Sequence, residues 1–221
     1  MKQYNFNYDY SKMLWMKMFL SEPDYDNNCS KVYINFEQAL EIVKTVDNIT
    51  QGIQKIIYLV GWQGLGHDDC WPEMDTVNEH LKREQDKTAR DSFLWLYEEA
   101  KKYNTVISVH VNVSDVVKED GIFDELVATN SVCNDINGKP AVLQILNNRN
   151  CYKTSYKQLW ESGIFKNLFD RFLEVIPAAD AGTIHLDNFC IAESLNPKTY
   201  IEEQDEARNK MLDYMYEKGV E

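Results

Sequence analysis

The chain has 221 residues, of which 44% are hydrophobic and 12% aromatic, a composition typical of a globular protein with one large domain or two small ones. Its 23 basic and 36 acidic residues give a formal net charge of −13, which excludes sequence-independent binding to the phosphates of DNA or RNA. The longest apolar run, residues 56–60, is too short to cross a bilayer, and the polar start of the chain lacks the basic-then-apolar order of a secretory signal. We therefore expect no nucleic-acid or membrane partner and, by sequence, a cytoplasmic protein.

The first half of the chain contains two clear helices and two clear strands. Residues 12–20 fit either a short helix or a strand, whereas residues 36–49 have helical apolar spacing behind Asn35, a plausible N-cap. Residues 55–62 are nearly continuously apolar, which is typical of a buried strand in a parallel sheet. A long loop follows, then a helix over 88–103 that begins with Thr88 and Asp91 in a capping-box arrangement, and a second strand over 105–113.

The second half continues this alternation after an insertion. A short helix is expected over 122–129, a turn at Asn137-Gly138 and a strand over 140–146 within the insertion. Residues 156–176 are mostly helical, residues 183–189 form the third strand, and Asn196-Pro197 opens a last helix that Gly219 closes.

Alternating strands and helices predict an α/β fold with a parallel sheet. A closed (β/α)₈ barrel needs eight strands and about 250 residues, so we predict a partial TIM-type barrel of about three to four βα units, the front half of a barrel or a shortened one. The whole chain, 1–221, is interpreted as a single domain, with a lead-in over 1–35 and βα units over 36–221. Open sheet edges predict association into homo-oligomers.

Polar residues occupy one face of the second and third strands. Ser108, His110 and Asn112 alternate with apolar residues, as do His185 and Asp187. A carboxylate in a sheet needs partners or a function, so Asp187 is either a structural cap of the following loop or a catalytic group. His110 and His185 are either neutral core histidines or, with Asp187, three metal ligands. A fourth ligand and a recognisable spacing are missing, so we predict no metal.

The loop after the first strand combines glycines, polar residues and tryptophans. Trp62, His67, Asp68 and Trp71 suit a sugar, because a sugar ring presents apolar C–H faces and hydroxyl edges; alternatively, the loop is ordinary and its tryptophans pack inward. The sequence contains no P-loop, GxGxxG turn or GxSxG elbow, so we expect neither a nucleotide cofactor nor a serine hydrolase. The five cysteines form no CxxC pair and are expected to be reduced thiols, and we predict no cofactor.

Residues 57–63 (IYLVGWQ), followed by Gly66-His67-Asp68, resemble the first strand and loop of the endo-α-N-acetylgalactosaminidases, glycoside hydrolase family 101. The preceding helix and residues 109–112 (VHVN) also fit, and residues 185–187 (HLD) resemble the strand that ends in the family's nucleophile. The resemblance spans about residues 36–189, apart from an insertion around 134–150.

The resemblance implies a (β/α)₈ catalytic domain that releases a disaccharide from O-glycans α-linked to Ser or Thr, with retention of configuration. Asp187 matches the nucleophile, His67 and Asp68 match residues that hold the terminal sugar, and Asn112 lies in the same pocket wall. Trp62, His110 and His185 complete the predicted substrate-binding set. The family's acid/base is a Glu on the next strand, a role we do not transfer to Glu221, so the acid/base is expected to be missing and the chain inactive alone.

Two hypotheses follow. The first is part of a retaining glycoside hydrolase that acts on α-linked N-acetylgalactosamine; the second is a non-catalytic half-barrel that binds carbohydrate or itself. Family enzymes are usually exported, in contrast to the location suggested by the sequence.

Overall fold

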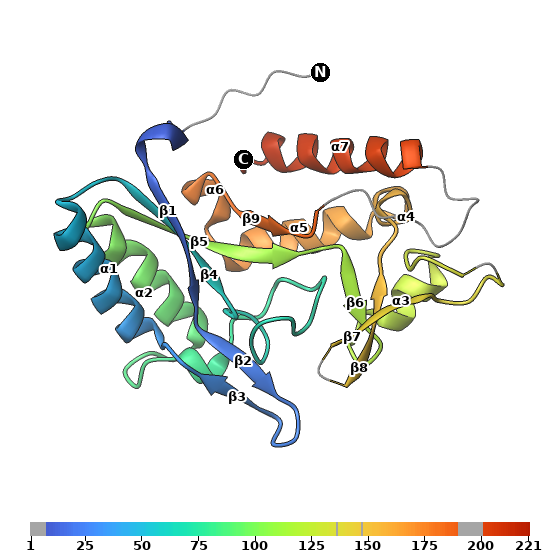
Figure 1. Ribbon diagram of the computed structural model, residues 1–221, viewed down its shortest axis with the longest axis horizontal. Coiled ribbons are helices and arrows are strands. Elements are labelled where there is room, and N and C mark those ends of the chain that lie inside the picture. The colour runs from blue at the N-terminus through green and yellow to red at the C-terminus, as the bar shows by residue number, and fades with distance from the viewer. Residues whose placement is uncertain (1–7, 136, 147, 190–200) are drawn as a thin grey trace.

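The computed structural model describes residues 8–135, 137–146, 148–189 and 201–221. Its centre is a parallel four-stranded sheet in the order β1-β4-β5-β9, comprising β1 (Leu14–Phe19), β4 (Lys55–Val60), β5 (Thr105–Asn112) and β9 (His185–Asp187) (Figure 1). Helices follow these strands in turn: α1 (Phe36–Thr50), α2 (Ala89–Lys101), α5 (Ile164–Val175) with α6 (Ala178–Ala181), and α7 (Ile201–Glu217). The sheet curls into a half-barrel of four βα units, which confirms the predicted fold class.

The ambiguous segment near the start of the chain is strand β1. Its alternate residues Met16 and Met18 pack toward the helices, whereas Trp15 and Phe19 on the other face are exposed. Because Trp15 and Phe19 stand on the exposed face beside Lys17, both faces of the strand are rich in apolar residues and the sequence shows no clear alternation. The first βα unit therefore starts at residue 14, within the segment that the sequence suggested as a lead-in.

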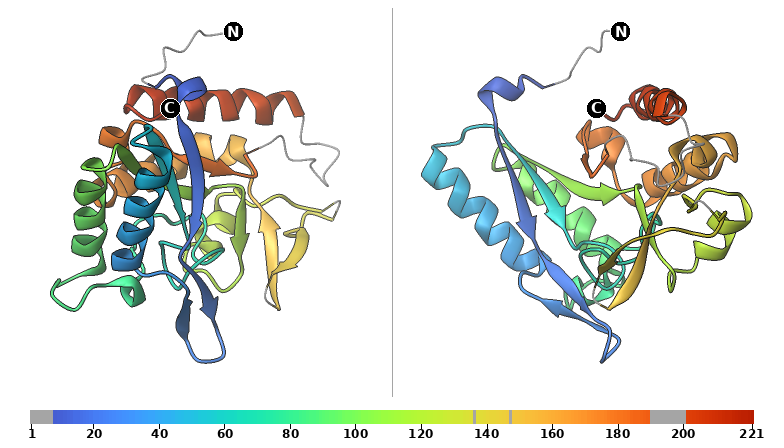
Figure 2. Two further views of the ribbon diagram at one scale, coloured as in Figure 1. Left: turned by 60° about the vertical axis from the view of Figure 1, so that its left-hand side comes forward. Right: turned by 45° about the vertical axis from the view of Figure 1, so that its right-hand side comes forward.

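Helices α1 and α2 lie side by side on the outer face of the sheet (Figure 2). Both begin with complete capping boxes, Asn35 with Gln38 and Thr88 with Asp91, as the sequence predicted. They cover β4, which is buried along its whole length. The core between sheet and helices contains Phe36, Val43, Ile57, Leu59, Phe93, Leu96, Val109 and Val111.

Two features interrupt the simple alternation. A β-hairpin, β2 (Ser21–Asp24) with β3 (Cys29–Val32), follows β1 and was not predicted. Between β5 and α5 lie α3 (Phe123–Ala128) and a three-stranded antiparallel sheet, β6 (Asp115–Val117), β8 (Arg149–Lys153) and β7 (Val142–Leu146), in the order β6-β8-β7. The insertion predicted around residues 134–150 thus contributes β7 and the start of β8 to a sheet beside the barrel.

The expected long helix over 156–176 is two helices. Helix α4 (Tyr156–Glu161) ends before Gly163, whose φ of 80° belongs to the left-handed region, and α5 starts after it. Short 3₁₀ turns, η1 (Tyr10–Lys12) and η2 (Glu79–Leu81), complete the described elements. Asn196-Pro197 and Cys190 lie outside the described residues.

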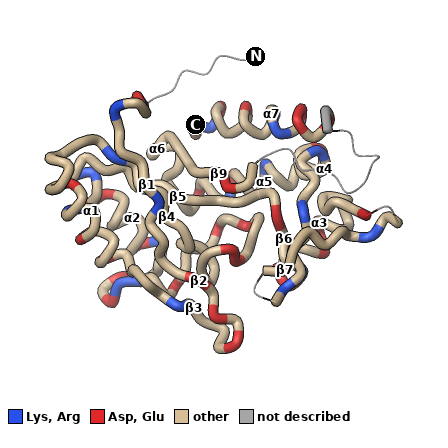
Figure 3. Tube along the Cα trace, viewed as in Figure 1, with Lys and Arg blue, Asp and Glu red and all other residues tan. Residues whose placement is uncertain are grey.

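The described parts of the chain contain no helix that is both long and apolar enough to cross a bilayer. Cys29, Cys70, Cys133 and Cys151 are free thiols. Strand β5 carries no charged residue, and Asp187 marks the end of β9 (Figure 3). The concave face thus carries Asp187 at the end of β9 and Lys17 within β1.

Candidate active site

The polar faces of β5 and β9 meet on the concave side of the half-barrel. Parallel pairing sets His110 beside His185 and Asn112 beside Asp187. Nδ1 of His110 lies 3.1 Å from Nδ1 of His185, within hydrogen-bond distance. The polar residues that the sequence placed on separate strands are thus neighbours at the carboxyl ends of the sheet, where α/β proteins build their sites.

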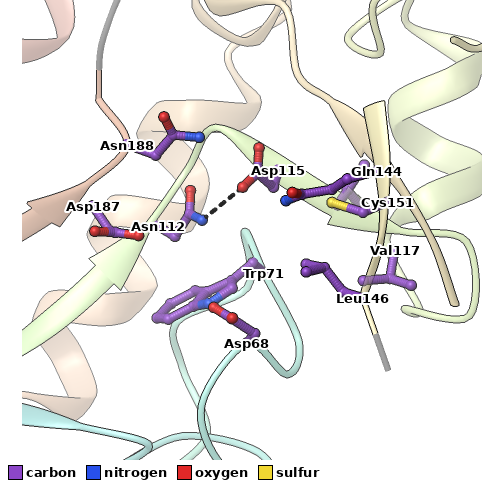
Figure 4. A pocket seen from close by; sticks show the side chains of 11 residues that line it. Asp68, Trp71, Asn112, Asp115, Val117, Gln144, Leu146, Cys151, Asp187 and Asn188 are labelled. Carbon is purple, nitrogen blue, oxygen red and sulfur yellow. Dashed lines mark hydrogen bonds between the residues drawn. The ribbon is translucent and has the colours of Figure 1, made fainter. Parts of the chain in front are cut away.

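A cavity of about 140 Å³ opens at this edge of the sheet (Figure 4). Asp187 from β9, Asn112 from β5 and Asp68 from the loop after β4 all line it. Its remaining lining comprises Trp71, Asp115, Val116, Val117, Gln144, Leu146, Cys151 and Asn188. Three of the predicted site residues therefore converge on one cavity, although they lie in segments far apart in the sequence.

Curvature of the sheet adds a cation from the opposite edge. Strands β1 and β9 are separated by β4 and β5, yet Nζ of Lys17 on β1 lies 4.0 Å from Oδ1 of Asp187. Such a contact requires the sheet to curl until its concave side chains approach one another. Lys17 compensates the negative charge at Asp187 and also acts on both histidines.

The acidic lining affects Asp68 most clearly. Burial raises the pKa of the Asp68 carboxyl, and Asp187 and Asp115 raise it further, while the adjacent His67 opposes the shift. Nε2 of His67 lies 3.4 Å from Oδ2 of Asp68. The cavity thus holds carboxyl groups close enough to influence one another, with Asp68 shifted toward its neutral form.

His110 and His185 are kept uncharged. Burial lowers the pKa of His110 to about 3, and the charges of Lys17, His185 and His67 act in the same direction. Burial and Lys17 also lower the pKa of His185, against the effect of Asp187. Both imidazoles are therefore neutral at pH 7. Within the described parts of the chain, Nε2 of His110 is buried without a hydrogen-bond partner.

The same two histidines and Asp187 form a possible metal-ligand group. Their ligating atoms lie within 4.8 Å of one another. Three nitrogen and oxygen donors in this arrangement suit a divalent transition metal. The ammonium group of Lys17, 4.0 Å from Asp187, would repel a metal cation bound by the same carboxyl group.

Two predicted binding residues, Trp62 and His67, pack against other aromatic rings near the cavity. Trp62 is fully buried, its Nε1 donates a hydrogen bond of 2.8 Å to the backbone oxygen of His110, and its indole packs on Phe93 and Phe172. The ring of His67 packs against those of His110 and Phe19. Of the predicted site residues, those that do not line the cavity are Trp62, His67, His110 and His185; the tryptophan that lines it is Trp71.

Close backbone packing holds the loop that carries Asp68. Gly61 has a φ of 75°, and a Cβ built there would lie 2.1 Å from the backbone oxygen of Ser21. Ser21 in turn donates from Oγ to the Gly61 oxygen at 2.7 Å and accepts from the His67 amide at 2.9 Å. The unpredicted β2–β3 hairpin therefore fixes the start of this loop through a contact that only glycine permits.

Sequence reasoning missed Lys17 and Asp115. Lys17 belongs to residues 12–20, which from the sequence fit either a helix or a strand. Asp115 follows Asn112 by three residues and accepts a hydrogen bond of 3.0 Å from Asn112 Nδ2, while Ser114 donates to Asn112 Oδ1 from its amide and its hydroxyl. The polar alternation of the second strand already included Ser114, and the run of short polar residues after that strand was the available signal for Asp115.

Comparison with known proteins identifies relatives of this fold and sequence. The sequence profile of the endo-α-N-acetylgalactosaminidases matches residues 25–188. Among solved structures, α-N-acetylgalactosaminidase NagBb of Bifidobacterium bifidum superimposes with a TM-score of 0.72 at 13% identity, over 95% of this chain and 34% of that enzyme. Its complex with GalNAc gives a TM-score of 0.68 at 14% identity, with the same coverage.

The α-galactosidase TtGalA of Thermus thermophilus, in complex with stachyose, has the same fold with a TM-score of 0.56 at 12% identity, over 94% of this chain and 38% of that one. No curated protein matches the chain in sequence. The chain spans about a third of the length of the structural relatives named first. These likenesses confirm a glycoside hydrolase-like half-barrel, and the profile match, which covers most of the chain, shows that it belongs to the endo-α-N-acetylgalactosaminidase family, glycoside hydrolase family 101.

Proposed function

We propose that this domain acts on α-linked N-acetylgalactosamine of O-glycans by a retaining mechanism, with Asp187 as nucleophile. The observation that carries the proposal is the convergence of Asp68, Asn112 and Asp187 on one cavity at the carboxyl ends of the strands. Membership of the family supports the substrate class. The names of the structural relatives, an α-N-acetylgalactosaminidase and an α-galactosidase, agree with an α-linked galacto-configured sugar.

In the proposed reaction, a carboxylate oxygen of Asp187 attacks the anomeric carbon while the bond to the glycosidic oxygen breaks. A glycosyl ester forms, and water later hydrolyses it to restore the carboxylate and the configuration. The neighbouring Lys17 charge orients and stabilises the carboxylate before attack. Asp68 and Asn112 hold sugar hydroxyls by hydrogen bonds.

The leaving oxygen needs a proton donor, and retaining enzymes place the second carboxyl group about 5–5.5 Å from the nucleophile. Glu221 does not fill this place: its amide donates to the oxygen of Gly182 and its oxygen accepts from the amide of Ile184, so it lies at the amino end of β9, opposite Asp187. A general acid contributes about 10²–10⁴-fold to such a reaction, so turnover of natural O-glycans depends on a second carboxyl group at that distance.

The test is covalent labelling. An activated 2-fluoro glycoside with a good leaving group bypasses most of the need for the acid and traps the glycosyl ester. Mass spectrometry is expected to find the label on Asp187 and none in the Asp187→Asn variant, because an amide cannot attack. Asp124→Asn, at an exposed position on α3, is the matched control and should label normally. A label on another carboxylate would contradict the assignment.

A non-catalytic half-barrel that self-associates is the second candidate. The observation that favours it is apolar surface on the concave side of edge strand β1, where Trp15 is 64% and Phe19 39% exposed. Exposed apolar side chains beside an open sheet edge promote pairing. Sedimentation velocity at increasing concentrations is expected to show dimers; a single monomer peak at all concentrations would contradict this candidate.

A further inference from the structure

The loop that carries Asp68 has a backbone conformation that its own residues disfavour. Asp68 and Cys70 have φ angles of 60° and 64°, in the left-handed region that residues other than glycine rarely adopt. Such positions persist only where the surrounding structure fixes them. Asp68 and Trp71, from the same loop, both line the cavity beside Asp187 (Figure 4). Their placement therefore depends on what holds Asp69, the residue between the two left-handed positions.

The carboxylate of Asp69 anchors this loop. Asp69 is buried, and its Oδ2 accepts hydrogen bonds of 2.8 Å from the amide of Leu65 and 3.1 Å from Sγ of Cys70. Its Oδ1 accepts a bond of 3.0 Å from the hydroxyl of Tyr25, at the turn of the β2–β3 hairpin. One carboxylate oxygen thus closes the loop from within, and the other ties the loop to a neighbouring segment.

Arg149 of β8 supplies the positive charge beside this carboxylate. Its guanidinium lies 3.6 Å from Oδ1 of Asp69 and 3.5 Å from Oδ1 of Asp120. It also lies over the ring of Tyr25, 3.8 Å from the ring centroid, and donates to the Tyr25 hydroxyl. A planar guanidinium can stack on a ring and pair with two carboxylates at once, whereas a lysine ammonium is a point charge. Arg149 therefore joins the loop of Asp68 to the hairpin and to the β6-β8-β7 sheet.

This cluster holds more negative than positive charge. Asp69 and Asp120 are both buried, and in the described parts of the chain Arg149 alone forms an ion pair with them. The pKa of Asp120 is raised to about 6, mainly by burial; Asp69 and Glu73 add to the shift, and the amide of Val117 and Arg149 oppose it. Both carboxyl groups are therefore ionised at pH 7. Without the guanidinium they would repel each other, and that repulsion would act directly on Asp69.

We propose that Arg149 is a positioning residue: it holds Asp69, and through Asp69 the loop conformation in which Asp68 meets the sugar beside Asp187. Arg149 does not line the cavity itself, so it acts through its neighbour in the loop. The inference rests on the proposed function, in which Asp68 binds a sugar hydroxyl. Arg149 belongs to the insertion around residues 134–150, outside the motifs that carry the family resemblance.

Two variants of the 221-residue chain separate positioning from stability. Asp120→Asn removes the excess negative charge and leaves Arg149 on Asp69, so it is the reference. Arg149→Met added to Asp120→Asn removes the cation without leaving a charged residue 120 unpaired, and circular dichroism is expected to show a retained fold. If this double variant does not fold, Tyr25→Phe takes its place, because it removes the hydroxyl bond to Asp69 and keeps the ring under Arg149.

The first measurement needs no ligand. The indole Nε1–H signal of Trp71 in a proton–nitrogen correlation spectrum, assigned with Trp71→Phe, reports on the loop at the cavity. It is expected to shift in the Arg149→Met variant relative to the Asp120→Asn reference. The signal of Trp62, whose Nε1 donates to the backbone oxygen of His110, is expected to stay. An unchanged Trp71 signal overturns the inference, and equal shifts of both signals overturn it too, because they indicate a general perturbation.

The second measurement is a double-mutant cycle with Asp68. Isothermal titration calorimetry gives the affinity for galactosyl-β1,3-N-acetylgalactosamine. In the Asp120→Asn reference, Arg149→Met is expected to weaken binding at least fivefold. When Asp68→Asn is also present, the same change is expected to cost less than twofold, because the side chain that Arg149 positions has lost its charge.

The outcomes distinguish the inference from the proposed function. An equal loss of affinity with and without Asp68→Asn overturns the positioning role and leaves the proposed function intact. Rescue supports the inference: Arg149→Lys in the Asp120→Asn reference restores the charge and is expected to recover part of the affinity. If the wild type binds no disaccharide at millimolar concentration, sugar binding at this cavity is overturned, and the Trp71 signal still decides whether Arg149 holds the loop.

Discussion

Acidification from pH 7 to pH 5 is expected to weaken the fold through His110. This imidazole is 2% exposed, and its pKa is lowered from 6.5 to about 3, mainly by burial. The unfolded chain therefore binds a proton at pH 5 while the folded chain does not. A group whose pKa is lower in the folded state contributes stability above the unfolded pKa, and this is lost as pH falls from about 6.5 toward 3.

The two pKa values set the size of the effect. Because the His110 imidazole takes up a proton in the unfolded chain but not in the folded one between pH 7 and pH 5, the free energy of unfolding falls by about 2 kcal/mol over this range. His185, whose pKa is also lowered, acts in the same direction. Asp120 acts against it, because burial raises its pKa to about 6 and protonation on acidification favours the folded state. The pH profile of the wild-type protein alone therefore mixes opposing contributions.

The difference between two proteins isolates His110. Urea unfolding followed by tryptophan fluorescence at pH 7, 6 and 5 is compared for the wild type and His110→Asn, which keeps a side-chain nitrogen near His185. The wild type is expected to lose about 2 kcal/mol more than the variant between pH 7 and 5. His80→Asn, at an exposed position in η2, is the control and should parallel the wild type. Parallel curves for His110→Asn and the wild type would refute the reasoning.

Two further substitutions test the supports of the site. Gly61→Ala is expected to destabilise the fold by about 3 kcal/mol or more, because its Cβ would lie 2.1 Å from the Ser21 oxygen. The control is Gly138→Ala: Gly138 has a similar φ, 78° against 75° for Gly61, but no atom lies within 4 Å of its Cβ position, so this variant should lose only about 1 kcal/mol. Equal melting temperatures of the two variants would contradict the steric argument. Arg149→Met leaves Asp120 buried without its cation and is expected to cost about 3–5 kcal/mol at pH 7 in urea unfolding. That loss should shrink at pH 5, where Asp120 is protonated more readily, and a loss independent of pH would count against the ion pair.

The helices and central strands could be predicted because their signals are local. Asn35 and Thr88 each cap a helix whose apolar residues recur at helical spacing over three to four turns. The residues of β4 are apolar on both faces of the strand because both faces are buried. Polar alternation in β5 and β9 likewise indicated the side of the sheet on which Asn112 and Asp187 lie.

The remaining site depends on contacts between distant segments. Lys17 contacts Asp187 only because the sheet curls, and the residue pattern of neither strand indicates how strongly the sheet curls. Trp62 and Trp71 belong to the same loop and have similar sequence neighbours. Trp62 is nevertheless buried, with its Nε1 donating to the backbone oxygen of His110 in β5, whereas Trp71 lines the cavity. Which tryptophan meets the ligand is decided by how the loop packs, and no local pattern separates the two.

Strand β9 joins the sheet through three paired positions, whereas β1 and β4 pair over six. Short ladders open at a smaller free energy than the whole protein unfolds, so the amide hydrogens around His185 and Asp187 are expected to exchange with solvent before those of β4. A sugar that bridges Asn112 and Asp187 would bind only the closed arrangement and slow this exchange in proportion to its occupancy. Protection of β9 amides is thus a direct readout of ligand binding that needs no turnover, and it links the chemistry of the site to the least tethered strand of the half-barrel.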